Sequence, residues 1–306
     1  MANDILVGST GFVGGNLAAC HSFAAACHST DVHTAFDTPH SLVVYAGVPS
    51  AMFLANQDPQ ADLEVMRRAR QNLRRLMPEQ AVLISSITVY ADSRGKDEES
   101  PLNPEGLAAY GANRLQLENW VREDFPNALI VRLPALYGRG LKKNFLYDLH
   151  TITPALLRPA KYDELSEKSE AVRLGYEDAG NGFYKQNGKV GKEELRAFFE
   201  GNDFNALAFT DSRSRYQFYD LSRLWGDIEK ALAAGLTTLN LTTPPVSAGE
   251  VYQYVTGKEW ENHLAAAPFD YDLRSRHAGL LGGGGGYLCT KEQELESIRS
   301  FLENWK

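Results

Sequence analysis

The chain has 306 residues, 43% hydrophobic and 23% charged, which is typical of a globular protein with one large domain or a domain plus a lobe. Its formal net charge of -8 disfavours nucleic acid as a partner, because neutralising phosphates requires clustered Lys and Arg. Three cysteines are too few for a disulfide framework, and no apolar run reaches the length of a membrane span. The opening residues, MANDILVGSTGFVG, lack the basic region of a signal peptide, so we expect a cytoplasmic protein with no membrane partner.

Strand and helix patterns alternate along the first half of the chain. The run NDILVGS predicts a buried strand that turns through glycines into a helix beginning near Phe12, and AAACHST predicts a weaker second strand. SLVVYAG, AVLISS and ALIVRL predict three more buried strands, with helices over residues 60–77 and 110–124 between them. Strands that alternate with helices and read as continuous apolar runs indicate a parallel sheet covered on both faces.

The second half of the chain has a different character. Residues from about 141 to 211 are richer in charge, aromatic side chains and glycine, and GNGFYKQNGKVG predicts a loop. A helix over 221–234 and the strand LTTLNL predict a return to the first domain, followed by helices near 248–256 and 291–305. Between these last two helices, Gly282–Gly286 predicts either a flexible loop or a backbone nest that closes on a ligand.

A glycine pattern, Gly8-x-x-Gly11-x-x-Gly14, directly follows the first strand. Such glycines let a strand turn tightly into a helix whose N-terminal amides can receive a pyrophosphate, although they also suit a turn that binds nothing. An acidic residue about twenty positions further on would accept the hydroxyls of the adenosine ribose and favour NAD. Asp31 is the best candidate, and it fits a turn residue equally well, while Ser29 and Thr30 beside it would tolerate the phosphate of NADP.

Tyr110 and Arg114, in YGANR, lie four residues apart on a predicted helix and therefore share one face. Seen alone, they would be an ordinary surface pair. Together with the glycine turn and the strand VLISSITVY, in this order, YGANR resembles the Tyr-x-x-x-Lys motif of the extended short-chain dehydrogenase/reductases, in the NAD-dependent epimerase/dehydratase family. Arginine stands here in place of the lysine of that motif. The resemblance is clear over residues 5–138.

The resemblance implies an α/β fold with a Rossmann-type doubly wound parallel sheet and a smaller, discontinuous C-terminal substrate lobe. We expect residues 1–140 and about 213–243 to form the dinucleotide-binding domain. About 141–212 and 244–306 would then form the lobe. A homodimer through the helices at 60–77 and 110–124 is also implied, although the basic run Arg67–Arg75 on the first of them would oppose close pairing.

The resemblance further implies that Ser86, Tyr110 and Arg114 form the catalytic group. A tyrosine loses its proton at about pH 10, so its phenolate requires nearby positive charge and hydrogen bonds at neutral pH. Arginine supplies the charge, but it stays protonated and relays protons poorly compared with lysine. Two hypotheses follow: an NAD(P)-dependent epimerase or reductase that acts on a sugar nucleotide or related hydroxylated substrate by Tyr-assisted hydride transfer, or a catalytically weakened dinucleotide-binding sensor or regulatory protein.

Other positions narrow the reaction and the binding sites. Ile87 and Thr88 stand where the family's dehydratases carry an Asp-Glu pair, which disfavours dehydration, and Ala135 replaces a sugar-binding asparagine. The resemblance places the cofactor, NAD as a weak preference or else NADP, against Gly8, Thr10, Gly11, Phe12, Val13, Gly14, Asp31, Ala46, Gly47, Tyr110, Arg114 and Leu133. It places the substrate against Ser86, Asn144, Arg213 and Arg274, with Arg215 and Arg276 as further phosphate-binding candidates.

Two Cys-His pairs, Cys20-His21 and Cys27-His28, carry ligand types that zinc prefers. Their spacing does not match the usual zinc motifs, so we expect no metal.

Overall fold

The computed structural model describes residues 3–305, which form two compact units. The first unit contains the residues up to Leu141, Arg215–Val246 and Asp270–Phe301, and the second contains Lys142–Ser214, Ser247–Phe269 and the residues from Leu302 onward. Residues 270–301 therefore pack in the first unit, whereas the sequence placed all of 244–306 in the lobe. The reason is apolar burial, since Leu273, Leu281 and Leu288 are buried in hydrophobic clusters of the first unit.

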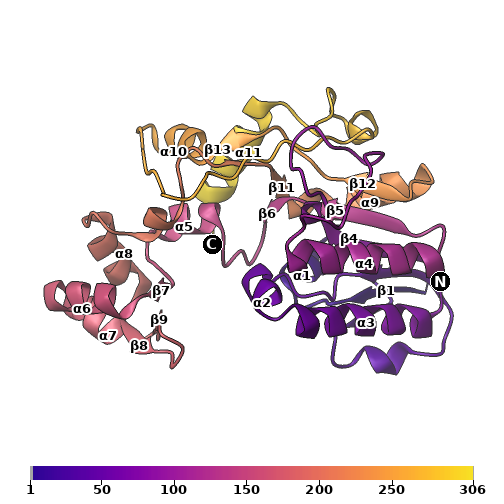
Figure 1. Ribbon diagram of the computed structural model, residues 1–306, viewed down its shortest axis with the longest axis horizontal. Coiled ribbons are helices and arrows are strands. Elements are labelled where there is room, and N and C mark those ends of the chain that lie inside the picture. Colours follow the sequence, from indigo (N-terminus) through magenta and orange to yellow (C-terminus); the bar gives the residue numbers. More distant parts are fainter. Residues whose placement is uncertain (1–2, 306) are drawn as a thin grey trace. The chain divides into compact units, whose positions relative to one another are not determined.

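A six-stranded parallel sheet forms the centre of the first unit (Figure 1). Its strand order is β12-β5-β4-β3-β1-β2, so the chain winds outward in both directions from β1 and β3. This arrangement confirms the predicted doubly wound α/β fold. The strands are β1 (Asp4–Val7), β2 (Ala25–Cys27), β3 (His40–Tyr45), β4 (Pro78–Ser86), β5 (Leu129–Leu133) and β12 (Thr238–Asn240).

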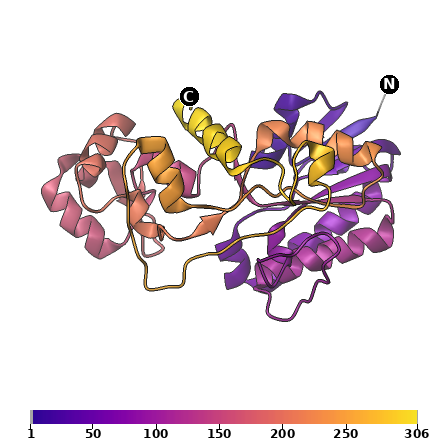
Figure 2. The ribbon, with the colours of Figure 1, turned by 90° about the horizontal axis from the view of Figure 1, so that it is seen from above.

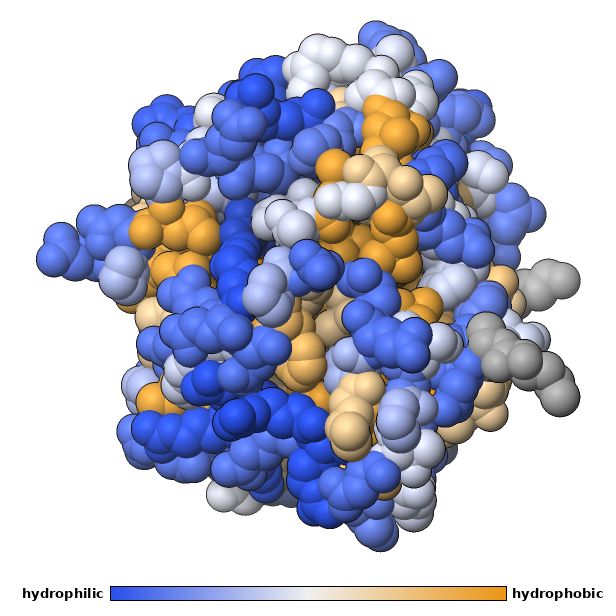
Figure 3. All heavy atoms as spheres, turned by 90° about the vertical axis from the view of Figure 1, so that its right-hand side faces the viewer, coloured by the Kyte–Doolittle hydropathy of each residue, from blue (hydrophilic) through white to orange (hydrophobic). Residues whose placement is uncertain are grey.

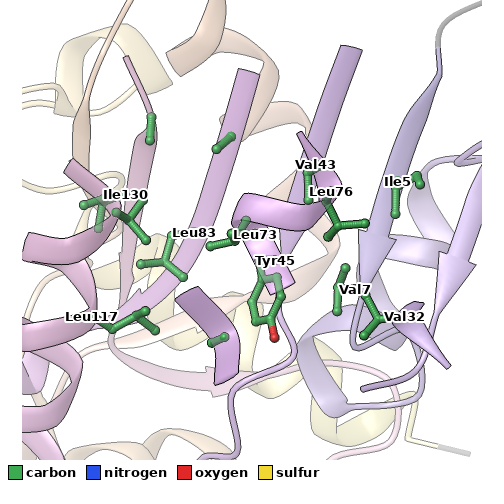
Figure 4. Close-up of a cluster of buried hydrophobic side chains, with 14 of the residues drawn as sticks. Ile5, Val7, Val32, Val43, Tyr45, Leu73, Leu76, Leu83, Leu117 and Ile130 are labelled. Atoms are coloured by element: carbon green, nitrogen blue, oxygen red, sulfur yellow. The ribbon is translucent and has the colours of Figure 1, made fainter. Parts of the chain in front are cut away.

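Helices cover both faces of this sheet because successive residues of each strand point to opposite sides. On one face, Ile5, Val7 and Val43 pack with residues of α3 (Pro59–Leu76) and α4 (Ala109–Asp124), as Figure 4 shows for Leu73, Leu76 and Leu117. On the other face, Leu6 and Val44 pack with α1 (Phe12–Cys20) and α9 (Leu224–Ala233). Figure 2 shows the orange α9 and the purple α4 on opposite sides of the sheet.

Local signals fix where several helices begin and end. Asp58 caps α3 by accepting a hydrogen bond from the Ala61 amide at 3.0 Å, and Pro59 occupies the first helical turn, where its missing N–H costs nothing. At the other end, Met77 adopts a left-handed conformation with φ 49°. In the second unit, Ser247 and Glu250 form a capping box at the start of α10 (Ala248–Thr256).

The second unit has its own apolar core around Leu165, Val172 and Phe199. A small antiparallel sheet in the order β7-β9-β8 combines β7 (Leu156–Leu157), β8 (Tyr176–Asp178) and β9 (Tyr184–Gln186). Strand β9 lies within the segment predicted as loop; its flanking glycines form the turns, and the aromatic Tyr184 packs against the core. The remaining helices of the unit are α5 (Phe145–Thr151), α6 (Pro159–Lys168), α7 (Glu170–Gly175) and α8 (Lys192–Glu200).

Shorter elements complete the fold. In the first unit, β6 (Ala135–Tyr137) pairs in parallel with β11 (Phe218–Asp220). The other elements are β10 (Arg215–Tyr216), which pairs with β13 (Val246–Ser247), the helices α2 (Met52–Gln57) and α11 (Lys291–Glu303), and the 3-10 helices η1 (Val32–Ala35), η2 (Ile87–Val89), η3 (Ala206–Phe209), η4 (Leu221–Arg223) and η5 (Ala278–Leu281).

An ionic network is buried between α4 and the sheet. The Glu118 carboxylate is fully buried and accepts hydrogen bonds from Arg132 Nη2 at 2.7 Å and from Ser85 Oγ at 2.6 Å. Arg132, 1% exposed, also donates through Nη1 to the Tyr90 hydroxyl at 2.6 Å. A pair of opposite charges that is well hydrogen-bonded tolerates such burial, whereas a single charge left there would be costly. This network therefore ties α4 to β4 and β5.

On the face shown in Figure 3, hydrophobic residues form separate areas among hydrophilic ones, as is normal for a folded surface. No helix within residues 3–305 is long and apolar enough to cross a membrane. The basic run on α3 is largely neutralised within the chain, since Arg70 lies 2.6 Å from Asp124 and Arg75 lies 2.7 Å from Asp37. Like-charge repulsion is therefore a weak objection to pairing through α3, and the homodimer stays a prediction.

Candidate functional site

The glycine turn lies at the point where the sheet topology reverses, between β1 and β3. Gly8 adopts φ +90°, and a Cβ atom on it would lie 2.6 Å from the carbonyl oxygen of Ala46. A Cβ on Gly14 would lie 2.1 Å from the carbonyl oxygen of Gly8. Side chains are thus excluded at both positions, and we call this tight backbone turn at the carboxyl end of β1 the glycine cradle. Nucleotides bind doubly wound sheets at this place.

The first turn of α1 completes this cradle. Gly11 donates its amide to the Gly8 carbonyl at 2.9 Å, so the helix starts directly after the turn. The amides of Phe12, Val13 and Gly14 fall in the first turn, where a helix offers them no acceptor. Such amides, at the positive end of the helix dipole, suit a pyrophosphate. These residues therefore fit a dinucleotide.

Asp31 lies in the loop after β2, the strand next to β1. It is partly buried, and its Oδ1 accepts a hydrogen bond from the amide of His28 at 2.6 Å, which is the behaviour of a turn residue. Thr10 Oγ1 lies 3.0 Å from Nδ1 of the same histidine. The ribose contact of Asp31, and with it the preference for NAD, stays a prediction.

The other expected cofactor positions lie at the same edge of the sheet. Ala46 and Gly47 follow β3, and a Cβ on Gly47 would lie 3.2 Å from Val7 Cγ1, so the strand ends approach closely. Leu133 ends β5 and is paired in register with Ser86, the last residue of β4. The structure thus places the glycine turn, Ala46–Gly47, Leu133 and Ser86 along one carboxyl edge.

Tyr110 reaches this edge because α4 packs tightly against the turn after Ser86. The residue after the tyrosine, Gly111, makes this possible: a Cβ there would lie 2.2 Å from the carbonyl oxygen of Thr88. The Tyr110 amide donates to Asn56 Oδ1 at 2.9 Å, which anchors the start of α4 to α2. Sequence reasoning missed Gly111 and Asn56, although a glycine inside a predicted helix is a signal of close packing.

Arg114 is stacked on Tyr110, with its guanidinium carbon 3.8 Å from the centre of the phenol ring. It is 4% exposed, and it donates from Nη1 to Asp62 Oδ2 and from Nη2 to the Pro49 carbonyl, both at 2.5 Å. Its charge is therefore shared with a carboxylate on α3 and does not act on the tyrosine alone. Asp62, which the sequence did not single out, is thus the partner of the arginine that replaces lysine.

The pKa of Tyr110 is raised above its ordinary value. Burial of the hydroxyl raises it most, and the negative charge of Asp62 adds to this. The positive charge of Arg114 and the polar interactions with Arg114 and Ser86 lower it, but they do not outweigh burial. Arg114 and Ser86 thus lower the pKa of Tyr110, as expected. Because burial raises the pKa by more, the hydroxyl of Tyr110 stays protonated at neutral pH.

The expected substrate residues have local partners. In the second unit, Asn144 caps α5 through Oδ1, which accepts the amides of Leu146 and Tyr147 at 3.0 and 3.2 Å. Arg213 makes a two-pronged pair with Asp211 at 2.9 and 2.7 Å. In the first unit, Arg274 pairs with Asp272 at 3.2 Å, Arg215 with Asp270 at 3.3 Å, and Arg276 with Glu99 at 3.1 Å. A phosphate would have to compete with these carboxylates, and the substrate roles stay predictions.

The five-glycine segment forms a compact turn. Gly283 donates its amide to the Ala278 carbonyl, and Gly284 and Tyr287 exchange hydrogen bonds at 2.9 and 3.1 Å. A Cβ on Gly283 would lie 2.0 Å from the Tyr287 carbonyl oxygen, which explains the need for glycine there. Among residues 3–305, no group of three or more His, Cys, Asp or Glu side chains is arranged to hold a metal ion.

Comparison with known proteins supports this architecture. Residues 6–154, somewhat less than half of the chain, match the model of a family described as RmlD substrate binding domain. No curated protein sequence matches the chain. Among solved structures, RMD from Pseudomonas aeruginosa complexed with NADPH is similar, with 16% identity, a TM-score of 0.62 and 99% of each chain covered.

Two further structures are similar at comparable levels. A dTDP-4-dehydrorhamnose reductase from Yersinia enterocolitica shares 11% identity with a TM-score of 0.65 over 100% of both chains. A UDP-glucose 4-epimerase with UDP-glucose from Thermotoga maritima shares 11% identity with a TM-score of 0.62, covering 98% of this chain and 97% of the other. At these identities the likeness is one of fold. The whole chain therefore has the Rossmann-type fold of these enzymes, and its residues 6–154 match the RmlD substrate binding domain.

Proposed function

We propose that this protein is an NAD(P)-dependent oxidoreductase or epimerase, of the extended short-chain dehydrogenase/reductase type, that acts on a sugar nucleotide or a related hydroxylated substrate. The observation that carries the proposal is the placement of Ser86 and Tyr110 at the same sheet edge as the glycine cradle. NADPH bound to the similar RMD, and UDP-glucose bound to the similar epimerase, support the cofactor and substrate classes.

In this proposal, some residues of the chain bind the cofactor and others transfer the proton. The cradle of Gly8 and Gly14 and the first amides of α1 would hold the pyrophosphate of NAD or NADP. The bound nicotinamide supplies hydride-transfer chemistry. Tyr110 gives a proton to the substrate oxygen, or takes one from it, while Ser86 orients that oxygen. Dehydration is disfavoured, because Ile87 and Thr88 provide no acid and base for an elimination.

The raised pKa of Tyr110 favours the reductive direction. A protonated hydroxyl is a general acid, which reduction of a ketone requires, whereas oxidation requires the phenolate. We expect the kcat for reduction to stay flat from about pH 6 to about pH 9 and to fall only as Tyr110 ionises at higher pH. A pH profile of kcat with a dTDP- or UDP-linked ketosugar measures this. A fall centred near neutral pH would contradict the protonated tyrosine.

Cofactor binding is tested by titrating the protein with NADH and with NADPH and following nicotinamide fluorescence. Gly14→Ala should abolish binding and lower the free energy of unfolding by about 1–3 kcal/mol, because its Cβ would overlap the Gly8 carbonyl oxygen. Gly15→Ala is a matched control, since its Cβ would lie 3.6 Å from the Ser9 carbonyl oxygen, an ordinary contact. Equal binding by both variants would remove the cradle from the proposal.

A catalytically weakened sensor is the second candidate, favoured by the contacts of Arg114. The guanidinium contacts Asp62, the Pro49 carbonyl and the phenol ring, and as a group that stays protonated it does not reproduce the lysine of the family motif. In Arg114→Lys, a gain in turnover without loss of cofactor binding would indicate that arginine has weakened an ancestral activity. If wild-type protein binds the cofactor and shows no Tyr110-dependent turnover on any sugar nucleotide, the sensor replaces the enzyme.

A further inference from the structure

A cavity of the first unit contains none of the glycine-turn residues, Ser86, Tyr110 or Arg114 in its lining. Its volume is about 350 Å³, within the range of small-molecule sites. Residues of β6, β11, η4, η5 and α11 line it, together with the segment before α11. The polar lining includes Tyr137, Asp220, Arg223, Cys289, Glu294 and Ser297.

Glu294 gives this cavity an unsatisfied acceptor. The residue is 3% exposed, and its Oε1 has no hydrogen-bond partner within residues 3–305. Its Oε2 accepts a hydrogen bond from the thiol of Cys289, a weak donor, with Sγ at 3.5 Å. A buried carboxyl oxygen without a partner is costly, and native structures seldom keep one that no ligand or water satisfies. The side chain thus offers an acceptor to whatever fills the cavity.

Two neighbouring donors bond to other groups. The Tyr137 hydroxyl donates to Ser297 Oγ at 2.7 Å. Arg223 lies 3.5 Å from the Asp227 carboxylate and donates to the Leu281 carbonyl at 3.4 Å. Within residues 3–305 no lining donor reaches Glu294 Oε1, so its partner is a molecule that enters the cavity, either water or a ligand.

Burial and the charges that face Glu294 together set its pKa. Burial raises its pKa to about 8 and the negative charge of Asp220 adds to this, while the Cys289 thiol and the positive charge of Arg223 lower it. Burial also raises the pKa of the Cys289 thiol to about 12 and that of the Tyr137 hydroxyl beyond its ordinary value, so both stay neutral. Glu294 is therefore the group of this cavity that changes charge near neutral pH.

We propose that this cavity binds a small organic molecule through a primary ammonium group, which donates an N–H hydrogen bond to Glu294 Oε1. On binding, the carboxyl proton of Glu294 passes to solvent, and the resulting carboxylate pairs with the ammonium. Asp220 adds a second negative charge in the same lining. The cavity is separate from the cofactor cradle, so this proposal can be tested independently of the proposed enzymatic activity.

Ethanolamine is a suitable probe, and choline is its matched control, because choline keeps the hydroxyl and the positive charge but has no N–H donor. We expect saturable, millimolar binding of ethanolamine by calorimetry, with proton release detected as a difference between buffers of unlike ionisation enthalpy. At pH values below the pKa of Glu294, the affinity should increase about tenfold for each unit that the pH is raised, because the carboxyl group must lose its proton on binding. Choline should not bind or compete.

Glu294→Gln is the decisive variant, since glutamine keeps the shape of a protonated carboxyl but cannot become negative. It should lose ethanolamine binding while keeping its melting temperature and its response to NADH. Glu296→Gln, on the same helix with a half-exposed carboxylate, should bind like wild type. No saturable binding by wild type, unchanged binding by Glu294→Gln, or equal binding of choline would each overturn the proposal and leave a cavity filled only by water.

Discussion

Tyr110→Phe is expected to lower turnover on the proposed sugar-nucleotide substrate by about 100- to 10,000-fold, the usual contribution of a positioned general acid or base. The variant loses only the hydroxyl that would exchange a proton with the substrate. Its phenyl ring can still stack beneath the Arg114 guanidinium, which lies 3.8 Å from the ring centre in the native protein. Nicotinamide fluorescence should therefore show unchanged binding of NADH or NADPH. Single-turnover kinetics with saturating cofactor measures the loss.

Tyr176→Phe is a control for that experiment, because it removes a buried tyrosine hydroxyl in the second unit, where it bonds to the Pro154 carbonyl. It should reduce stability modestly and leave the chemical step unchanged. If Tyr110→Phe turns over at the wild-type rate, Tyr110 is not the proton-transfer group. If both variants lose activity together, the effect is structural.

Glu118→Ala is expected to lower the free energy of unfolding by about 3–5 kcal/mol, because it leaves the guanidinium of Arg132 buried without a partner. The same change removes the acceptor of Ser85 Oγ, which lies beside Ser86 at the end of β4. Urea unfolding followed by circular dichroism measures the effect, with the midpoint and slope both reported.

Arg122 provides the contrast within the same network. Its side chain is 34% exposed and lies 3.1 Å from Glu118 Oε2, so Arg122→Ala should cost less than about 1 kcal/mol. A double variant, Glu118→Gln with Arg132→Met, should recover much of the stability lost by Glu118→Ala, since no buried charge remains. A loss below about 1 kcal/mol for Glu118→Ala would show that water reaches Arg132.

Much of the fold could be predicted because its signals are local. Apolar strands such as Asp4–Val7 and Leu129–Leu133, alternating with helices, were enough to predict the parallel sheet, and the glycines after β1 predicted the tight turn into α1. The second unit was harder to predict. Strand β9 lies in a glycine-rich segment whose pairing partners come from other stretches of chain, so its sequence reads as loop.

The residues of the candidate site could be predicted from the sequence, but the contacts that these residues make could not. Ser86, Tyr110 and the glycine turn could be ordered along the chain, and parallel strand ends bring such residues to one edge. The pairing of Arg114 with Asp62 could not be predicted, because the two residues lie on different helices and 52 positions apart in the chain. The balance between charge and burial at Tyr110 depends on the same packing.

The sequence by itself determined the alternation of strands and helices, the place of the glycine cradle and the identity of the proton-transfer candidates, since each depends on residue type and short-range spacing. Only the tertiary structure decided where residues 270–301 pack, what Arg114 contacts and that Glu294 faces a cavity with an unpaired oxygen. These three features depend on contacts between segments that are distant in the chain. Such contacts bury charged groups, and burial changes the free energy of a charge in a way that local sequence patterns do not show.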